Sequence, residues 1–279
     1  MIGRMPPSRP RCALFAVPVA VAILVSMAHA APAKKPAPRF EELRKELRST
    51  EPATIARALT AVEKLGKEAA PLAPDVEALL RRGLTKDLAL AAIHTLGGVA
   101  QPSSSKVLGP WARHRAAELR LAAVTALGDT GGPASVAPLR KALSDKEKPI
   151  RSAAATSLGR TGGRDAMTDL EAALDKELPE ASWALGRLCE DRECEALAAR
   201  LAKQPFALVA RGLEQAIVRA GGSDELKERL IARVRDVGTD EARQFLAGLA
   251  ARYSGSARVK AALEAASKAP SGDGRRGGP

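Results

Sequence analysis

Apolar positions along the chain recur in a pattern that repeats every 31 residues. A Leu-Gly pair marks each repeat and begins at Leu65, Leu96, Leu127 and Leu158. After Leu127, further apolar residues follow at Val136, Leu139 and Leu143, and the same offsets after Leu158 give Met167, Leu170 and Leu174. Spacings of three, four and seven residues place such side chains on one stripe of a helix. A fixed period of this length predicts a solenoid, in which each unit buries its apolar face by stacking on its neighbours.

The segments around each Leu-Gly predict pairs of helices. The segments 119–126 and 150–157 are rich in alanine, the strongest helix former, and should be the second helix of each pair. We expect Gly128 and Gly159 to end these helices in the left-handed conformation. No stretch alternates with the two-residue period of a strand. The predicted fold is therefore an all-α solenoid, a right-handed superhelix of about seven helix pairs, over residues 39–267.

One repeat is shorter than the others. The step from Leu158 to the next anchor, Leu185, is 27 residues, so that four residues, about one helical turn, are missing. The gap falls around residues 175–182. We expect it to change the local stacking of the helices.

The first thirty residues have the features of an export signal. Arg4, Arg9 and Arg11 form a basic start, an apolar run covers 13–28, and Ala28-His29-Ala30 resembles a cleavage site. We expect cleavage after Ala30 and an exported protein, periplasmic or secreted. The alternative is an uncleaved membrane anchor, although the run is short for a spanning helix.

Both ends of the mature chain differ in composition from the repeats. Residues 31–38 are rich in proline and should form an extended linker. Residues 268–279 end in Gly, Ser, Arg and Pro, with few side chains able to join a core, and should be a disordered tail.

Charge narrows the range of partners. The chain has 44 basic and 32 acidic residues, and loss of the three arginines before residue 31 leaves a net charge of +9. The excess is spread among glutamates, as expected of solvated helix faces. Aromatic residues make up 3% of the chain, too few for stacking on single-stranded nucleic acid. Charge and export together argue against a nucleic-acid partner, and leave electrostatic contact with an anionic envelope surface open.

Two cysteines, Cys189 and Cys194, remain after cleavage. An even pair in an oxidising compartment is a disulfide candidate. By alignment, Cys189 lies at the turn between units and Cys194 in an apolar column that faces the core. The alternative is a buried Cys194 and a free thiol at Cys189.

The phrase Leu-Gly-x-x-Gly-Gly, followed by a helix with leucines three and four apart, resembles a HEAT repeat of the short bacterial type also found in phycobilisome lyases. This resemblance implies an α-solenoid whose second helices line a concave groove for a protein or peptide partner. It also implies an aspartate that ends the first helix and an arginine early in the second, as in Asp145 and Arg151. The preceding unit has the arginine, Arg120, but His114 stands where its aspartate is expected. The series of aspartate–arginine pairs that links successive repeats (the ladder) should therefore be incomplete.

A basic, partly aromatic segment around Trp111 is a candidate contact point, since tryptophan and arginine are frequent at binding hot spots. The alternative is that Trp111 fills a gap between units while the arginines are solvated. The candidate partner-binding residues are Trp111, Arg113, Arg115, Arg120 and Arg151.

We find no motif for a metal site, a cofactor or a catalytic group. The two histidines of the mature chain, His94 and His114, stand on different units. We therefore expect a non-catalytic scaffold that binds a protein or peptide through the groove. The alternatives are a lyase-like enzyme or accessory that presents a substrate, and a structural protein bound to the envelope.

Overall fold

The computed structural model describes residues 38–270. The expected export signal, the linker up to residue 37 and the tail from residue 271 lie outside the described residues. Within the described range the regular structure is α-helix and short 3-10 helix, without a strand, which confirms the all-α solenoid class. None of the described helices combines the length and apolar character needed to cross a bilayer.

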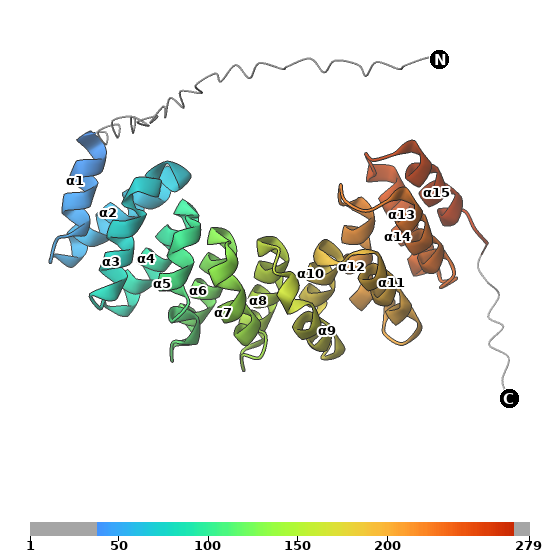
Figure 1. Ribbon diagram of the computed structural model, residues 1–279, viewed down its shortest axis with the longest axis horizontal. Helices are drawn as coiled ribbons and strands as arrows, with labels where there is room; N and C mark the ends of the chain where they lie inside the picture. The colour runs from blue at the N-terminus through green and yellow to red at the C-terminus, as the bar shows by residue number, and fades with distance from the viewer. Residues whose placement is uncertain (1–37, 271–279) are drawn as a thin grey trace, which may run out of the picture. The chain divides into compact units, whose positions relative to one another are not determined.

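The α-helices form seven pairs and a last single helix (Figure 1). The first helices are α1 (Pro38–Leu47), α3 (Ala73–Arg81), α5 (Ser105–Leu108), α7 (Pro133–Ala142), α9 (Met167–Asp175), α11 (Asp191–Ala199) and α13 (Asp224–Arg235). The second helices are α2 (Pro52–Leu65), α4 (Lys86–Val99), α6 (Ala117–Thr130), α8 (Lys148–Thr161), α10 (Pro179–Leu188), α12 (Phe206–Val218) and α14 (Asp240–Arg252). The single helix α15 (Ala257–Ser267) packs on α13 and α14.

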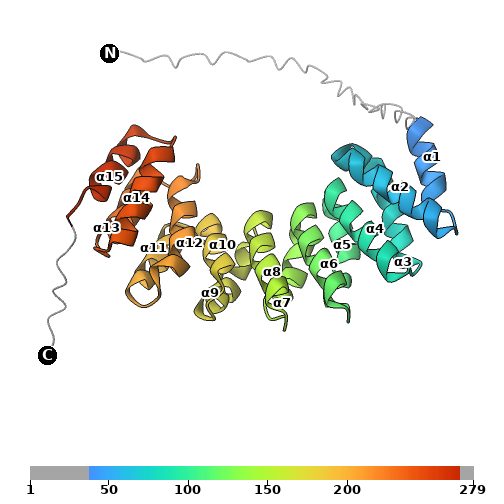
Figure 2. The ribbon, with the colours of Figure 1, turned by 180° about the vertical axis from the view of Figure 1, so that it is seen from behind.

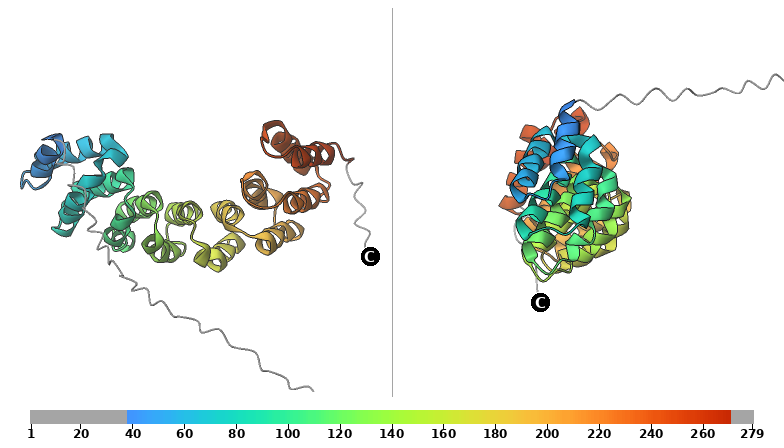
Figure 3. Two further views of the ribbon diagram at one scale, coloured as in Figure 1. Left: turned by 45° about the horizontal axis from the view of Figure 1, so that its top comes forward. Right: turned by 90° about the vertical axis from the view of Figure 1, so that its left-hand side faces the viewer.

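Short 3-10 helices connect or extend the pairs. They are η1 (Gly66–Leu72), η2 (Pro102–Ser104), η3 (Trp111–Arg113), η4 (Arg164–Ala166) and η5 (Arg200–Ala202). The pairs succeed one another in chain order, as Figures 1 and 2 show from opposite sides and the left view of Figure 3 shows from a tilted direction. Each second helix contacts the second helices before and after it, from α2 to α14. Every unit therefore buries its apolar face against its neighbours, as the period predicts.

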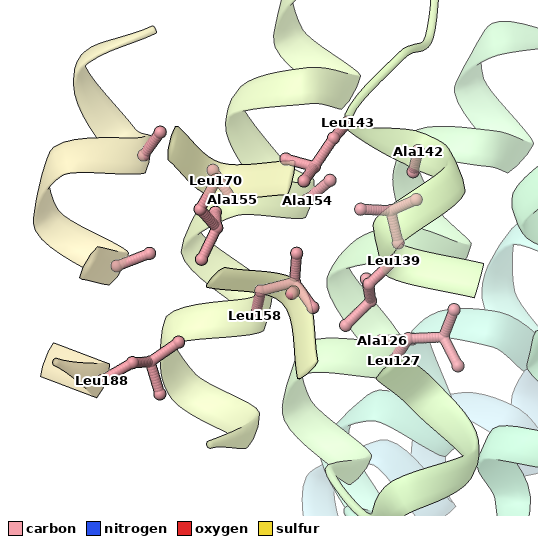
Figure 4. Packing of buried hydrophobic residues seen from close by; sticks show 14 of the residues in the cluster. Ala126, Leu127, Leu139, Ala142, Leu143, Ala154, Ala155, Leu158, Leu170 and Leu188 are labelled. Carbon is pink, nitrogen blue, oxygen red and sulfur yellow. The ribbon is translucent and has the colours of Figure 1, made fainter. Parts of the chain in front are cut away.

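The core runs through the whole described stack as one cluster of buried side chains. Figure 4 shows its central part, where the leucines of the predicted columns meet the alanines of α6 and α8. Leu127, Leu139 and Leu158 are completely buried there. Small alanine side chains let the second helices approach closely, and the leucines fill the space between the layers.

In the two central repeats, the glycine of the Leu-Gly pair does not end the second helix, whereas Gly66 of the first pair does cap α2. Gly128 and Gly159 are buried within α6 and α8, so the prediction that they cap these helices is wrong. The caps are Gly131 and Gly162, three residues later, with φ of 65° and 75°. A Cβ on Gly128 would lie 2.6 Å from the Cβ of Ser157 on α8. At Gly128 and Gly159 the glycine therefore permits close contact between neighbouring second helices.

The four-residue gap shortens one second helix. Helix α10 has 10 residues, whereas α4, α6 and α8 have 14 each. Three residues follow the anchor leucine in both α8 and α10, so the missing turn comes from the start of α10. The connection before α10 contains Glu177, a non-glycine residue with φ of 58°. The shortened unit therefore enters its second helix through an unusual turn.

Candidate partner-binding surface

The second helices α4, α6, α8 and α10 present three columns of exposed or partly exposed side chains. We call these columns the second-helix face. They are Leu90, Leu121, Ser152 and Pro179; His94, Thr125, Thr156 and Trp183; and Gly98, Asp129, Arg160 and Arg187. Members of a column stand one repeat apart, and successive columns are four residues apart on each helix. The register of the repeat therefore builds one surface from four helices.

Contacts made by the third column, Gly98, Asp129, Arg160 and Arg187, show that neighbouring helices share this surface. Asp129 on α6 forms an ion pair with Arg160 on α8. Arg187 on α10 donates from Nε to the carbonyl oxygen of Gly159 at 3.1 Å. Its guanidinium lies 5.3 Å from the ring centre of Trp183, in a cation–π contact.

Two residues give this face accessible apolar surface, Leu121 and Trp183. Leu121 is 37% exposed, which is unusual for a leucine in a packed stack. Trp183 stands where α6 and α8 have threonines, and our sequence reasoning missed it. The signal that could have identified Trp183 in the sequence is a tryptophan at a repeat position where α6 and α8 have threonine. His94, in the same column, is also exposed.

The segment around Trp111 lies at the turn before α6. Trp111 is partly buried, packs against the core and stacks on His114 with ring centres 5.6 Å apart. Arg113 and Arg115 are exposed. The tryptophan therefore has a packing role, and the two arginines are the accessible part of the expected contact point.

Arg120 is buried and is already engaged within the chain. Its side chain is 9% exposed, and its Nε and Nη2 donate to Oδ2 and Oδ1 of Asp145 at 2.7 and 2.9 Å. Its Nη1 donates to the carbonyl oxygens of His114 and Arg115, each at 3.1 Å. The hydrogen bond from Arg120 holds the pKa of Asp145 below its ordinary value. Arg120 is thus a structural residue, and the expectation that it contacts a partner is not supported.

The carboxylate of Asp145 pairs with an arginine of the preceding unit rather than with Arg151 of its own unit. The aspartate accepts the bidentate fork of Arg120, whereas Arg151 donates from Nη1 to the backbone carbonyl oxygens of Asp145 and Lys146, at 2.7 and 3.0 Å. Arg151 is partly exposed. Of the five candidate residues, Arg113, Arg115 and Arg151 are therefore the ones that offer a charged group to a partner.

The cysteine pair lies at the turn between α10 and α11. The structure joins Cys189 and Cys194 in a disulfide with Cα atoms 5.2 Å apart, and both residues are buried. The bond ties the end of α10 to the first turn of the next helix. At the same turn, the side chains of Glu190 and Glu193 form a capping box at the start of α11.

Arginines from both neighbouring units bind this turn. Arg164, before α9, donates from Nη1 to the carbonyl oxygen of Leu188 at 2.6 Å and from Nη2 to Glu193. Arg219, after α12, donates to the carbonyl oxygens of Arg187 and Cys189. Cations near a helix C-terminus satisfy its last carbonyl groups. Burial lowers the pKa of Arg219 from its usual value. Sequence reasoning missed both arginines, because each acts on a unit other than its own.

Replacing both cysteines with serine should lower the free energy of unfolding by about 2 kcal/mol, as expected for a bond that closes a short loop. Urea denaturation of the oxidised protein and the double variant measures this difference. Thiol counting on the denatured, unreduced full chain provides the control. Cys189 and Cys194 should contribute no free thiol, and two free thiols from this pair would contradict the disulfide.

No curated protein matches the chain significantly. Among solved structures, an engineered protein is 20% identical and has a TM-score of 0.48, with 81% of this chain and 71% of that chain covered. The complex of CpcE and CpcF of phycocyanin lyase from Nostoc sp. is 18% identical, with a TM-score of 0.46 and 85% and 98% of the two chains covered. A designed armadillo repeat protein in complex with a (KR)4 peptide is 16% identical, with a TM-score of 0.43 and coverages of 81% and 97%.

A sequence model of HEAT repeats matches residues 105–180. This range holds α5 to α9 and the start of α10, and includes the two repeats with the phrase Leu-Gly-x-x-Gly-Gly. The resemblance to HEAT repeats drawn from that phrase is therefore confirmed over residues 105–180.

Proposed function

We propose that this chain is an exported, non-catalytic scaffold that binds a protein or peptide partner through the second-helix face. The observation that carries the proposal is the continuity of that face over four helices. An extended surface with an exposed leucine and a tryptophan–arginine pair has the composition of an interface core with hot-spot residues. The threonine, aspartate and arginine side chains of the same face offer hydrogen-bond partners around these hot-spot residues.

Affinity capture tests the binding proposal. The full chain serves as bait for the envelope fraction of its own cells, beside the variants Leu121→Glu and Trp183→Ala. Both should reduce recovery of a specific partner by about tenfold or more, since each removes a hot-spot side chain. The control is Lys67→Glu, which changes an exposed residue of η1 outside the face. Equal recovery with all variants, or retention of a coloured small molecule in place of a protein, would contradict the proposal.

Export rests on the first thirty residues. The basic start, the apolar run and the Ala-x-Ala phrase together support a cleaved signal. N-terminal sequencing of the protein from fractionated cells should find Ala31 as the first residue, in the periplasmic or secreted fraction. A chain that keeps Met1 and stays with the membrane would be an anchored protein and would contradict cleavage.

A further inference from the structure

Arg120 shows how an arginine of this stack uses its guanidinium. One nitrogen, Nη1, is fixed by two carbonyl oxygens of the preceding turn. The opposite edge, formed by Nε and Nη2, then faces the next unit and binds both oxygens of Asp145. Such a fork matches the geometry of a carboxylate.

Arg151 repeats the first half of this arrangement one unit later. Its Nη1 is likewise fixed by two carbonyl oxygens, those of Asp145 and Lys146. Among the described residues, no carboxylate forms an ion pair with Arg151, and its Nε and Nη2 have no hydrogen-bond partner. In Arg120 the edge formed by Nε and Nη2 binds Asp145, whereas in Arg151 no group among residues 38–270 occupies this edge.

The carboxylate that would complete the pair is used elsewhere. Lys176 holds the repeat position of Asp145, and the residue before it, Asp175, is the last residue of the first helix of the next unit. Asp175 forms an ion pair with Arg200 and accepts from Nε2 of Gln204 at 3.2 Å. Both of these residues lie one unit further along. The ladder is thus interrupted at the shortened repeat, and the interruption leaves Arg151 without its partner.

Arg151 lines a surface cleft of about 420 Å³ between the turns that precede α8 and α10. Lys148 and Lys176 add two positive charges to its wall, and Leu178 lies at its edge. The acidic residues of the wall are Asp145, whose oxygens are bound by Arg120, and Glu177. The cleft therefore has a net positive charge. The carboxylate of Glu177 nevertheless repels a bound anion, and it repels a doubly charged anion more strongly than a singly charged one. One carboxylate fits this balance better than a phosphate.

We infer that this cleft binds a carboxylate group of the partner, which pairs with Nε and Nη2 of Arg151 as Asp145 pairs with Arg120. The inference rests on the proposed function, since it supplies one contact of the same partner. Ser152, the next residue on α8, belongs to the second-helix face. A peptide that crosses the face can therefore reach the cleft. The carboxylate belongs either to an acidic side chain or to a chain terminus.

Titration with short peptides tests the site without the natural partner. The full chain, labelled with ¹⁵N, is titrated with a peptide blocked at both ends that contains one aspartate. Parallel titrations use the same peptide with asparagine, an asparagine peptide with a free C-terminus, and inorganic phosphate. The aspartate peptide or the free C-terminus should shift the Nε–H signal of Arg151, which is assigned by its loss in Arg151→Lys. The preferred peptide shows which kind of carboxylate binds.

Arg151→Gln should weaken binding of the preferred peptide by about tenfold or more, because it removes two charge-assisted hydrogen bonds. Lys67→Gln, which changes an exposed residue of η1 outside both this cleft and the second-helix face, should leave it unchanged. Should Arg151→Gln fail to fold, Lys176→Glu provides a second variant, since it places a competing carboxylate beside the fork. Equal shifts with the asparagine peptide blocked at both ends, or tighter binding of phosphate, would overturn the inference.

The peptide titration and the capture experiment fail in different ways. Peptide binding without a captured partner would support carboxylate binding in the cleft and contradict the proposed function. Capture that depends on Leu121 and Trp183, without any peptide binding at Arg151, would support partner binding by the second-helix face and contradict carboxylate binding in the cleft.

Discussion

Replacing Gly186 with alanine is expected to destabilise the protein by about 3 kcal/mol or to prevent folding, as overpacking against immobile atoms does. Gly186 is the glycine of the Leu-Gly pair on α10. A Cβ there would lie 2.6 Å from the carbonyl carbon of Gly212 and 2.8 Å from its Cα. These are backbone atoms of α12, so no side-chain rotation can make room. Urea denaturation measures the loss.

Gly248→Ala is the matched control, because Gly248 also lies within a second helix, α14, but nothing stands within 4 Å of a Cβ at that position. There alanine should be neutral or should stabilise the helix by about 0.5–1 kcal/mol. Similar losses in both variants would mean that helix contact is not what requires glycine at position 186.

These glycines show what the sequence can and cannot predict about the fold. The period placed the helices and the buried leucines correctly, because burial of an amphipathic face is encoded in the spacing along the chain itself. It did not predict that Gly128 and Gly159 lie inside their helices. A glycine near a helix end has two physical uses, a left-handed cap and a close approach. Choosing between them requires the distance to another helix.

The candidate site shows the same limit. The repeat positions of Cys189 and Cys194 predicted that the first lies at the turn between units and the second faces the core, but they left open whether the two form a disulfide. The sequence did not reveal that Arg120 pairs with Asp145, because alignment places aspartate and arginine within one unit whereas the side chain reaches into the next. The missed residues Arg164 and Arg219 also act across units. A sequence alignment of repeats shows which residue stands in each column but not which unit its side chain contacts.

Replacing Asp145 with asparagine should lower the free energy of unfolding by about 3 kcal/mol at neutral pH, because it leaves the buried guanidinium of Arg120 without its charge partner. The matched control is Asp169→Asn. Asp169 pairs with Arg140 across two units in the same way, but both side chains are well exposed, at 39% and 44%. Its loss should change stability by less than about 1 kcal/mol.

The effect of Asp145 should also depend on pH in one direction. Its pKa in the folded protein lies below its ordinary value of 3.8, chiefly because Arg120 donates to its ionised form. A carboxyl group whose pKa is lowered by folding stabilises the protein above its ordinary pKa, and this stabilisation is lost as the pH falls through the folded pKa. The difference between the native protein and Asp145→Asn should therefore be constant near neutral pH and shrink below pH 3.8. Denaturation curves at a series of pH values measure it. A difference that is unchanged down to pH 2, or that grows on acidification, would show that the Arg120–Asp145 pair does not join these two repeats.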